Sequence, residues 1–307
     1  MKKLTILTYP LNDTKYASTG HPCVTRSLIA GLTEIGYDDF NFNPSKEDVG
    51  EHIHVLFGPG PCHTLQYALS LKKQGLIKRV TAGPNVFVFP FESDFLITDP
   101  DLDLYMVPSY WIKTLFETIV PQCCNKLCVW PSGISKDLID IERFPKKKAI
   151  IYKKNRSGLP DSFYDEIKLE IEKGGYIPIL IKYGNYEYDY YINALKESSF
   201  MVAVTDQEAQ GIFLSEAWAL DVPTLCYEQG YYTWKNALGG EDLTYYATSA
   251  CPYLTSETGV KFSNLDEFRQ LIKHIDFIIN QTSPRNWILN NMTDEISARN
   301  FLDILQL

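Results

Sequence analysis

The chain has 307 residues, 45% of them hydrophobic and 22% charged, which predicts a globular protein long enough to form two domains. Its net charge of -9 argues against a general nucleic-acid-binding protein, because such proteins carry an excess of basic residues. No stretch approaches the roughly 20 apolar residues of a membrane-spanning helix. We therefore expect no nucleic-acid partner and no membrane span, and at most a transient contact with a membrane surface.

The N-terminus and the cysteines both indicate a cytoplasmic protein. The apolar run after Lys2 and Lys3 covers only Leu4–Leu7, which is too short for a secretory signal and predicts a buried strand. The seven cysteines form no CxxC pair and no dense framework. This usage favours free thiols in a reducing compartment over disulfides or zinc.

Short apolar segments alternate with amphipathic ones along the first half, a pattern typical of parallel α/β structure. The predicted strands are Leu4–Tyr9, His52–Phe57, Asp103–Pro108 and Leu127–Trp130. Helical spacing marks three apolar faces: Val24, Leu28, Leu32 and Ile35, then Leu65 and Leu69, then Trp111, Leu115 and Phe116. Ser109 is the predicted N-cap of the last of these helices.

The same pattern restarts after a basic segment, Arg143–Lys148. The predicted strands there are Ala149–Tyr152, Tyr176–Ile181, Phe200–Val204 and Pro223–Tyr227. The predicted helices contain Phe163, Ile167 and Ile171, then Tyr188–Leu195, Glu216, the series Phe268, Ile272, Ile275 and Ile279, and Met292–Leu305. We therefore predict two Rossmann-like domains, residues 1–143 and 144–285, and a C-terminal helical segment, residues 286–307, that packs back on the first domain.

The segment Thr205–Pro223 carries the most informative motif. It leaves a predicted strand, turns at Gly211 and enters a helix, and seven residues separate Glu208 from Glu216. A glycine permits close approach of the backbone to a ligand, and the start of a helix offers free N–H groups to an anion. A carboxylate accepts hydrogen bonds from a sugar or ribose diol. Taken alone, however, the two glutamates are better explained as a helix-capping acid and a solvated one.

The residues around this pair favour a binding role. The segment resembles the retaining GT-B glycosyltransferases of family 4, whose signature it follows in order at Glu208, Gly211, Glu216, Ala217, Ala219 and Pro223. The resemblance implies an α/β fold of the GT-B type, with two Rossmann-like domains facing across a cleft. It also implies that Glu216 holds the donor ribose, that Glu208 is catalytic and faces the transferred sugar, and that Gln210, Gly211 and Ile212 line the donor site.

The chain departs from the family pattern at two places. Ala209 and Gln210 stand where Gly-Phe is common, and Asp221 stands where glycine is usual. These departures leave the base and the sugar of the donor open.

Two more loops extend the resemblance. Lys154 and Arg156 follow a strand where the family binds the donor diphosphate, and a lysine point charge with an arginine fork suits that group. The alternative is a charged surface loop; Lys153, one residue earlier, is expected to point to the opposite face. Tyr183 and Gly184 follow the next strand, where the family contacts the nucleobase, although a packed tyrosine is an equal alternative.

Acceptor-side candidates lie in the first half. Gly20 and His21 are similar to the family's glycine-containing loop after the first strand, without its usual double glycine. Asn85 follows a later strand and is placed to reach an acceptor. His21 is the histidine that we would test as a base.

No metal site or cofactor is predicted. Asp99 and Asp101 could be mistaken for the Asp-x-Asp metal motif of another glycosyltransferase fold, but they precede a strand inside a run of loop-forming residues and indicate a solvated acidic turn. His52 and His54 share one face of a strand without a carboxylate at a telling spacing.

The predicted function is metal-independent transfer of a sugar from a nucleoside diphosphate sugar to a glycan or other hydroxyl acceptor. The sequence offers no credible covalent nucleophile, so the resemblance favours same-face substitution with retention of configuration. Two alternatives stay open: a non-catalytic module that binds sugar nucleotides or glycans, and a sugar-nucleotide epimerase of the same fold.

Overall fold

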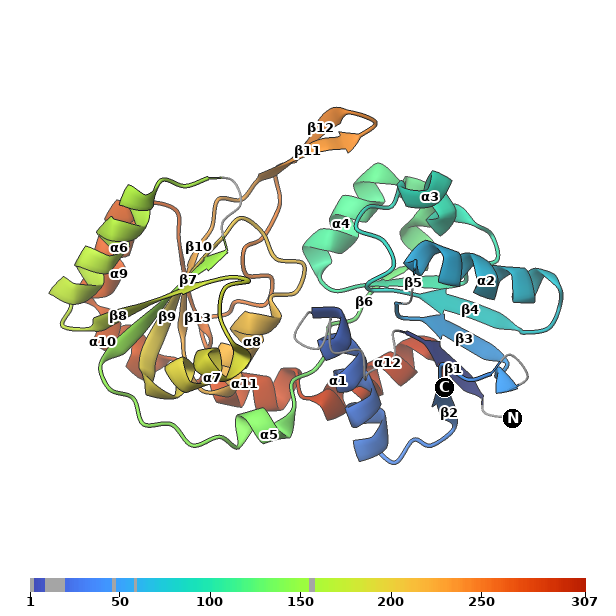
Figure 1. Ribbon diagram of the computed structural model, residues 1–307, viewed down its shortest axis with the longest axis horizontal. Coiled ribbons are helices and arrows are strands. Elements are labelled where there is room, and N and C mark those ends of the chain that lie inside the picture. Colours follow the sequence, from blue (N-terminus) through green and yellow to red (C-terminus); the bar gives the residue numbers. More distant parts are fainter. Residues whose placement is uncertain (1–2, 9–19, 46–47, 58–59, 155–157) are drawn as a thin grey trace. The chain divides into compact units, whose positions relative to one another are not determined.

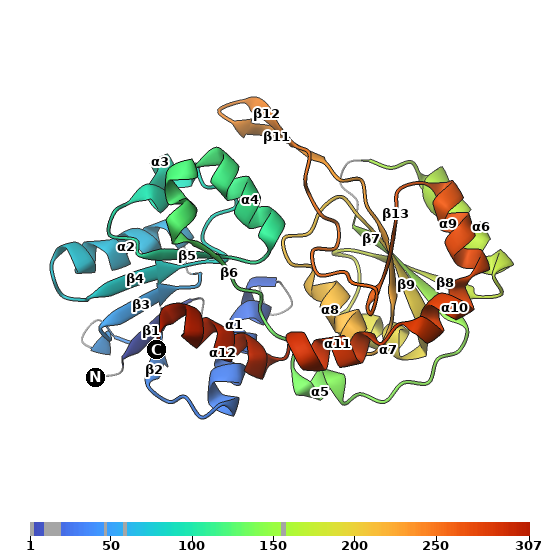
Figure 2. The ribbon, with the colours of Figure 1, turned by 180° about the vertical axis from the view of Figure 1, so that it is seen from behind.

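The computed structural model describes residues 3–8, 20–45, 48–57, 60–154 and 158–307. The chain divides into two compact units (Figures 1 and 2). The first consists of Met1–Gly133 with Thr293–Leu307, and the second of Ile134–Met292.

The first unit is a parallel α/β sheet with helices. Its strands, in the spatial order β2-β1-β3-β4-β5-β6, are β1 (Leu4–Leu7), β2 (Phe40–Phe42), β3 (His52–Val55), β4 (Arg79–Ala82), β5 (Leu104–Val107) and β6 (Leu127–Val129). Its helices are α1 (Gly20–Glu34), α2 (Pro61–Lys73), α3 (Glu92–Phe95), α4 (Tyr110–Ile119) and α12 (Asp294–Leu305), with short 3-10 turns η3 (Leu96–Thr98) and η4 (Pro121–Lys126). The strands pair in parallel throughout the described part of this sheet.

Helix α4 shows how far the apolar spacing predicts packing. Trp111, Leu115 and Phe116 are buried, as their helical spacing requires. Ser109 occupies the N-cap position, but its side chain makes no capping hydrogen bond. The helix is therefore held by its apolar face and not by its cap.

Helix α12 returns to the first unit and packs along α1. The Ser27 hydroxyl donates to the Asp294 carboxylate at 2.6 Å, and the Trp130 indole donates to the Ser297 carbonyl at 2.9 Å. A Cβ on Gly31 would lie 2.1 Å from the Asp294 carbonyl oxygen, so only glycine allows this approach. Helix α12 therefore belongs to the first unit.

The second unit holds a five-stranded parallel sheet in the order β13-β10-β9-β7-β8. Its strands are β7 (Lys148–Lys154), β8 (Ile177–Lys182), β9 (Ser198–Thr205), β10 (Thr224–Tyr227) and β13 (Gly259–Phe262). Its helices are α5 (Lys136–Ile139), α6 (Asp161–Lys173), α7 (Tyr188–Glu197), α8 (Ile212–Ala219), α9 (Leu265–Lys273), α10 (Ile275–Gln281) and α11 (Pro284–Asn291).

Alternating residues of the strands build two cores, one on each face of this sheet. In β7, Ile150 and Tyr152 pack with α7, α8 and α11, whereas Ala149 and Ile151 pack with α6, α9 and α10. Figure 1 shows these two groups of helices on opposite sides of the sheet. The second unit is thus a three-layer, Rossmann-like domain.

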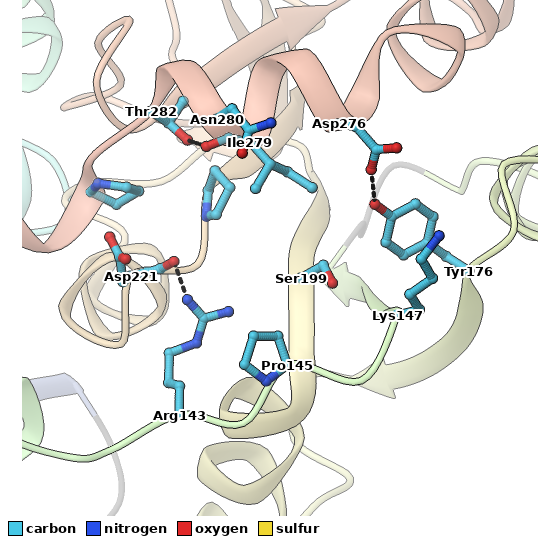
Figure 3. A pocket seen from close by; sticks show the side chains of 12 residues that line it. Arg143, Pro145, Lys147, Tyr176, Ser199, Asp221, Asp276, Ile279, Asn280 and Thr282 are labelled. Carbon is cyan, nitrogen blue, oxygen red and sulfur yellow. Dashed lines mark hydrogen bonds between the residues drawn. The ribbon is translucent and has the colours of Figure 1, made fainter.

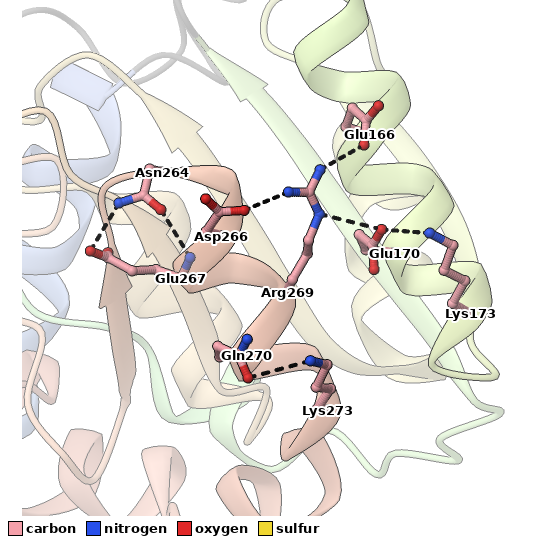
Figure 4. Close-up of polar contacts among 9 residues, drawn as sticks. All are labelled: Glu166, Glu170, Lys173, Asn264, Asp266, Glu267, Arg269, Gln270 and Lys273. Atoms are coloured by element: carbon pink, nitrogen blue, oxygen red, sulfur yellow. Dashed lines mark hydrogen bonds and ion pairs between the residues drawn. The ribbon is translucent and has the colours of Figure 1, made fainter.

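A cluster of ion pairs ties α9 to α6 at the surface of this layer. The Arg269 guanidinium lies 3.1 Å from Glu166 and 3.6 Å from Glu170 on α6, and 2.6 Å from Asp266 on its own helix (Figure 4). Glu170 also pairs with Lys173 at 2.7 Å. Exposed pairs of this kind add little stability, so the apolar core beneath them determines the packing.

The structure divides the chain at different residues from those predicted. The Ile134 amide donates to the Met292 carbonyl at 2.9 Å, so the chain enters and leaves the second unit at one point. Trp287 and Ile288 of α11 are buried in the core of that unit, together with Ile139 from α5. The apolar faces of α5 and α11 therefore place residues 134–143 and 286–292 in the second unit.

An antiparallel hairpin between β10 and β13 has no counterpart among the predicted elements. Its strands are β11 (Tyr232–Leu238) and β12 (Glu241–Tyr245), and Gly239 and Gly240 form the turn with positive φ. Figures 1 and 2 both show it, in orange, extending away from the five-stranded sheet. Two alternating runs around a Gly-Gly pair are a recognised hairpin signal that would have predicted it.

Candidate functional site

The strand order of the second unit has a topological switch point between β7 and β9. In chain order it corresponds to 2-1-3-4-5, with β7 first and β9 third, and ligands of such sheets bind beyond the carboxyl ends of the two strands where the order reverses. Lys154 ends β7 and is the register partner of Thr205, which ends β9. The loop that carries Glu208, between β9 and α8, begins directly after Thr205.

Glu208 is a buried carboxylate with a cation beside it. Its relative exposure is 6%. The Lys154 ammonium lies 2.9 Å from each of its two oxygens, and the Thr205 hydroxyl donates to Oε1 at 2.9 Å. Its backbone N–H donates to the Ser249 carbonyl at 2.9 Å. A carboxylate this deeply buried requires such partners, because an unpaired charge in a low-dielectric site is costly.

Lys154 lies over an aromatic floor. Its ammonium is 4.5 Å from the ring centroid of Tyr183 and 5.9 Å from that of Phe213. Two residues earlier on the same face of β7, the Tyr152 ring stacks on Phe213 at 4.1 Å. As the alternation predicts, Lys153 lies on the other face, where it pairs with Asp161 at the start of α6.

Gly211 starts α8 in a conformation that other residues adopt at a cost. Its φ is 81° and its ψ is 54°, and a Cβ there would lie 2.8 Å from a methyl carbon of Leu214. The helix follows immediately at Ile212, so its first N–H groups emerge beside the Glu208 loop. Gln210, the residue before the turn, is buried at 7% exposure.

Glu216 lies in the second turn of α8 and has a neutral partner. The Tyr188 hydroxyl donates to its Oε1 at 3.1 Å. Burial raises the pKa of Glu216 to about 7, and the bond from Tyr188 offsets part of that rise. At neutral pH this carboxyl therefore titrates, in contrast to an ordinary surface glutamate.

The structure brings most of the predicted donor-side residues to one edge of one sheet. Lys154, Tyr183, Gly184, Glu208, Gln210, Gly211, Ile212 and Glu216 all follow the carboxyl ends of β7, β8 and β9 or lie in α8. Tyr183 is 52% exposed, so it is not a packed core tyrosine. Arg156 lies outside the described residues.

Sequence reasoning missed the residues that hold this loop. The Glu228 carboxylate, after β10, accepts from the Ala250 N–H at 3.1 Å and from the Ser249 hydroxyl at 3.2 Å. Ser249 in turn accepts from the Glu208 N–H. A glutamate directly after a parallel strand was the available signal, since the carboxyl ends of neighbouring strands share an edge.

A cavity of about 480 Å³ lies at the opposite, amino-terminal edge of the same sheet (Figure 3). It is lined by Arg143, Pro145, Lys147, Tyr176, Ser199, Asp221, Pro223, Asp276, Ile279, Asn280, Thr282 and Pro284. Arg143 donates to the carbonyls of Asp221 and Ser198, and Tyr176 donates to Asp276. The Arg143 bonds fasten the segment after α5 to the second unit, and the Tyr176 bond joins the residue before β8 to α10. None of the predicted site residues lines this cavity.

The first unit brings two acceptor-side candidates together. His21, at the start of α1 after Gly20, stacks on Phe57 at 4.3 Å and is hydrogen-bonded to Asn85. Burial lowers the pKa of His21, and the bond to Asn85 raises it in part, so the imidazole is neutral at pH 7. His21 and Phe57 follow β1 and β3, the switch point of the first sheet.

The histidines and aspartates considered as metal ligands have structural partners. Burial lowers the pKa of His52 and of His54 to about 3, and both rings bond the Thr81 hydroxyl at 2.9 Å. Asp99 pairs with Lys73 at 2.8 Å and accepts from the Asp101 N–H, as in an acidic turn. Across the described ranges no group of three or more His, Cys, Asp or Glu is arranged to hold a metal ion. Nor does any helix in those ranges have the length and apolarity to cross a membrane.

No family model matches the chain, and no curated protein matches it in sequence. Solved structures do match its fold. The apo form of the lipopolysaccharide outer core galactosyltransferase WaaB is similar over 99% of both chains, with 12% identity and a TM-score of 0.61. A glycosyltransferase from Rickettsia africae ESF-5 is similar over 99% of this chain and 97% of its own, with 12% identity and a TM-score of 0.59.

A third similar structure is sucrose-phosphate synthase from Thermosynechococcus elongatus, with 99% of this chain and 98% of that chain covered, 11% identity and a TM-score of 0.58. At such identities the likeness concerns the fold. The chain has the α/β fold of GT-B proteins, with parallel sheets in two Rossmann-like domains, and the predicted fold class is confirmed.

Proposed function

We propose that this chain transfers a sugar from a nucleoside diphosphate sugar to a hydroxyl group of an acceptor, with the switch point of the second unit as its donor site. One observation carries the proposal. Lys154 at the end of β7 lies with Glu208, Gly211 and Glu216, which follow β9, at the edge where such sheets bind ligands. The GT-B fold is the architecture of the similar glycosyltransferases, and supports this choice.

Each group has a chemical task in this scheme. The Glu216 carboxylate accepts hydrogen bonds from the ribose diol, and the N–H groups at the start of α8 bind the diphosphate. Lys154 neutralises the charge that the leaving diphosphate develops, and Glu208 contacts the transferred sugar. We propose, from the family resemblance, that Arg156 also binds the diphosphate and that Tyr183 and Gly184 contact the base. Because Lys154 supplies this positive charge, we propose a metal-independent reaction.

The proposed step retains the configuration at the anomeric carbon. The bond from that carbon to the diphosphate oxygen breaks, and the acceptor oxygen forms its bond on the same face. The acceptor proton passes to the departing phosphate oxygen. Same-face substitution is favoured because Glu208 is held by Lys154 and Thr205 and is thus poorly disposed to act as a covalent nucleophile.

The test is a thermal-shift screen against UDP, GDP, ADP, CMP and their common sugar conjugates. One nucleotide family should raise the melting temperature of the wild type by mass action. Glu216→Ala should abolish that shift, whereas Glu172→Ala, an exposed glutamate on α6, should keep it. No shift with any nucleotide at millimolar concentration would refute the donor site.

Turnover then separates transfer from the two alternatives. A transferase releases the nucleoside diphosphate from its sugar slowly even without acceptor, because water replaces the acceptor hydroxyl. A binding module shows affinity without release. An epimerase converts one sugar nucleotide to another and releases nothing.

A further inference from the structure

The hairpin of β11 and β12 presents a row of hydroxyl-bearing side chains on one face. Tyr232 pairs with Tyr245 and Thr233 with Thr244, so alternation places Tyr231, Thr233, Thr244 and Tyr246 together; we name these four residues the tyrosine face. The Tyr231 and Tyr246 rings lie 6.0 Å apart with an interplanar angle of 32°. The two threonine hydroxyls are 2.9 Å apart.

This face is exposed. Tyr246 is 78% exposed and Tyr231 is 43% exposed, the former being the largest value among the exposed apolar and aromatic side chains of the described residues. Because the two rings are exposed to water on a two-stranded hairpin, they contribute little to the stability of the unit. Isolated two-stranded hairpins are themselves only marginally stable. Such exposed aromatic surface is typical of a binding site.

The base of the hairpin is fastened to the candidate donor site. The Glu228 carboxylate accepts from the Gly230 N–H at 3.2 Å, just before β11, and from the Ala250 N–H at 3.1 Å, shortly after β12. Ser249, beside Ala250, holds the backbone of Glu208. The tyrosine face therefore begins next to the loop that carries the proposed catalytic carboxylate.

The chemistry of the face identifies its ligand. Every member carries a hydroxyl, and the rings add flat apolar surface, which suits a molecule that alternates C–H faces with hydroxyl groups. The core of a protein interface would be more apolar. The hairpin carries Lys235 against Glu241 and Asp242, and Lys235 pairs with Asp242 at 2.6 Å. This balance gives no attraction to anionic lipid or to nucleic acid.

We propose that the tyrosine face binds an uncharged oligosaccharide, the acceptor of the reaction proposed above, and guides it to the donor site. The identification of the oligosaccharide as the acceptor rests on the proposed function, whereas binding of the oligosaccharide is measurable without turnover. The rings of Tyr231 and Tyr246 stack on sugar rings, and Thr233 and Thr244 bond their hydroxyls.

The experiment compares the wild type with the double variant Tyr231→Ala/Tyr246→Ala on an array of neutral and acidic oligosaccharides. The wild type should bind at least one neutral oligosaccharide, and the double variant should bind it at least about tenfold more weakly. Aromatic side chains that become buried on binding contribute most of the binding energy of such contacts. Tyr190→Ala, an exposed tyrosine on α7, is the matched control and should bind as the wild type does. Tyr246→Phe, which keeps the ring, should retain most of the binding.

Failure of this proposal is distinct from failure of the donor site. The nucleotide thermal shift should be equal in the wild type and the double variant, which also shows that the double variant is folded. Absence of neutral-oligosaccharide binding by the wild type, or undiminished binding by the double variant, would overturn the inference. Sedimentation of the wild type, but not of the double variant, with phosphatidylglycerol vesicles in place of oligosaccharide binding would assign the face to a membrane and overturn it as well.

Discussion

Replacement of Lys154 by methionine tests the buried ion pair at the centre of the candidate site. The variant keeps the length of the side chain and its contacts with the aromatic floor but removes the cation from Glu208. Lys154 retains 20% of its side-chain exposure and Glu208 only 7%, so the carboxylate left behind cannot reach water freely. The Thr205 hydroxyl still donates one hydrogen bond to it.

From this geometry we expect Lys154→Met to lower the free energy of unfolding of the second unit by about 3 kcal/mol, the lower end of the range for a broken buried pair. Glu208→Gln should cost less, because the lysine that it leaves behind can turn to solvent. The double variant should be more stable than the sum of the two single losses predicts, by about 2 kcal/mol.

Hydrogen exchange of the β7 and β9 peptides measures this free energy in the second unit separately from the first. Lys153→Met is the matched control: its partner Asp161 is 92% exposed, and this surface pair should contribute much less. A loss below about 1 kcal/mol in Lys154→Met, or strict additivity in the double variant, would show that the pair is not buried as described.

Three further predictions follow from the same structure. Gly211→Ala should destabilise the second unit by about 1–2 kcal/mol through left-handed strain and contact with a leucine methyl, and should weaken nucleotide binding. Gly175→Ala is the control: its φ is 81° and a Cβ there would meet nothing within 4 Å, so urea denaturation should show the strain alone. Because burial raises the pKa of Glu216 from 4.5 to about 7, the folded state binds this proton more tightly, so the melting temperature should fall as pH rises across that interval. Glu216→Gln should remove this slope, and Tyr188→Phe should move its midpoint to higher pH; an unchanged pH profile in both would contradict the assignment. Deletion of residues 293–307 should unfold the first unit, because α12 supplies part of its core, and a native-like circular dichroism spectrum and melting transition would disprove this.

Local sequence was sufficient for the strands and helices whose apolar residues repeat regularly. The continuous apolar run Phe200–Val204 predicts a strand that is buried on both faces, and the spacing of Trp111, Leu115 and Phe116 predicts one buried helix face. Both patterns depend only on the residues of the element. The turn at Gly211 could also be predicted from the sequence, since glycine is the residue that most readily adopts a positive φ between a strand and a helix.

The sequence did not predict the elements whose position depends on packing against the rest of the unit. The strands β2 and β13 are three and four residues long and lie at the edges of their sheets. No residue of β2 is buried and only two of β13 are, so neither strand shows a regular pattern. The sequence predicted that residues 286–307 pack on the first unit, but Trp287 and Ile288 of α11 pack in the core of the second unit. The segment's sequence is apolar in either case, and only packing decides which core receives it.

The sequence by itself therefore determined the α/β class, the two-domain plan and the residue types of the loops that carry Lys154, Glu208 and Gly211. Only the tertiary structure decided that Lys154 meets Glu208 and that Glu228 and Ser249 hold the loop between them. The physical reason is that neighbouring parallel strands are joined through crossover helices and need not be consecutive in the chain. Helices packed on both faces set the order that places β7 beside β9, and this order brings residues 154 and 208 into contact.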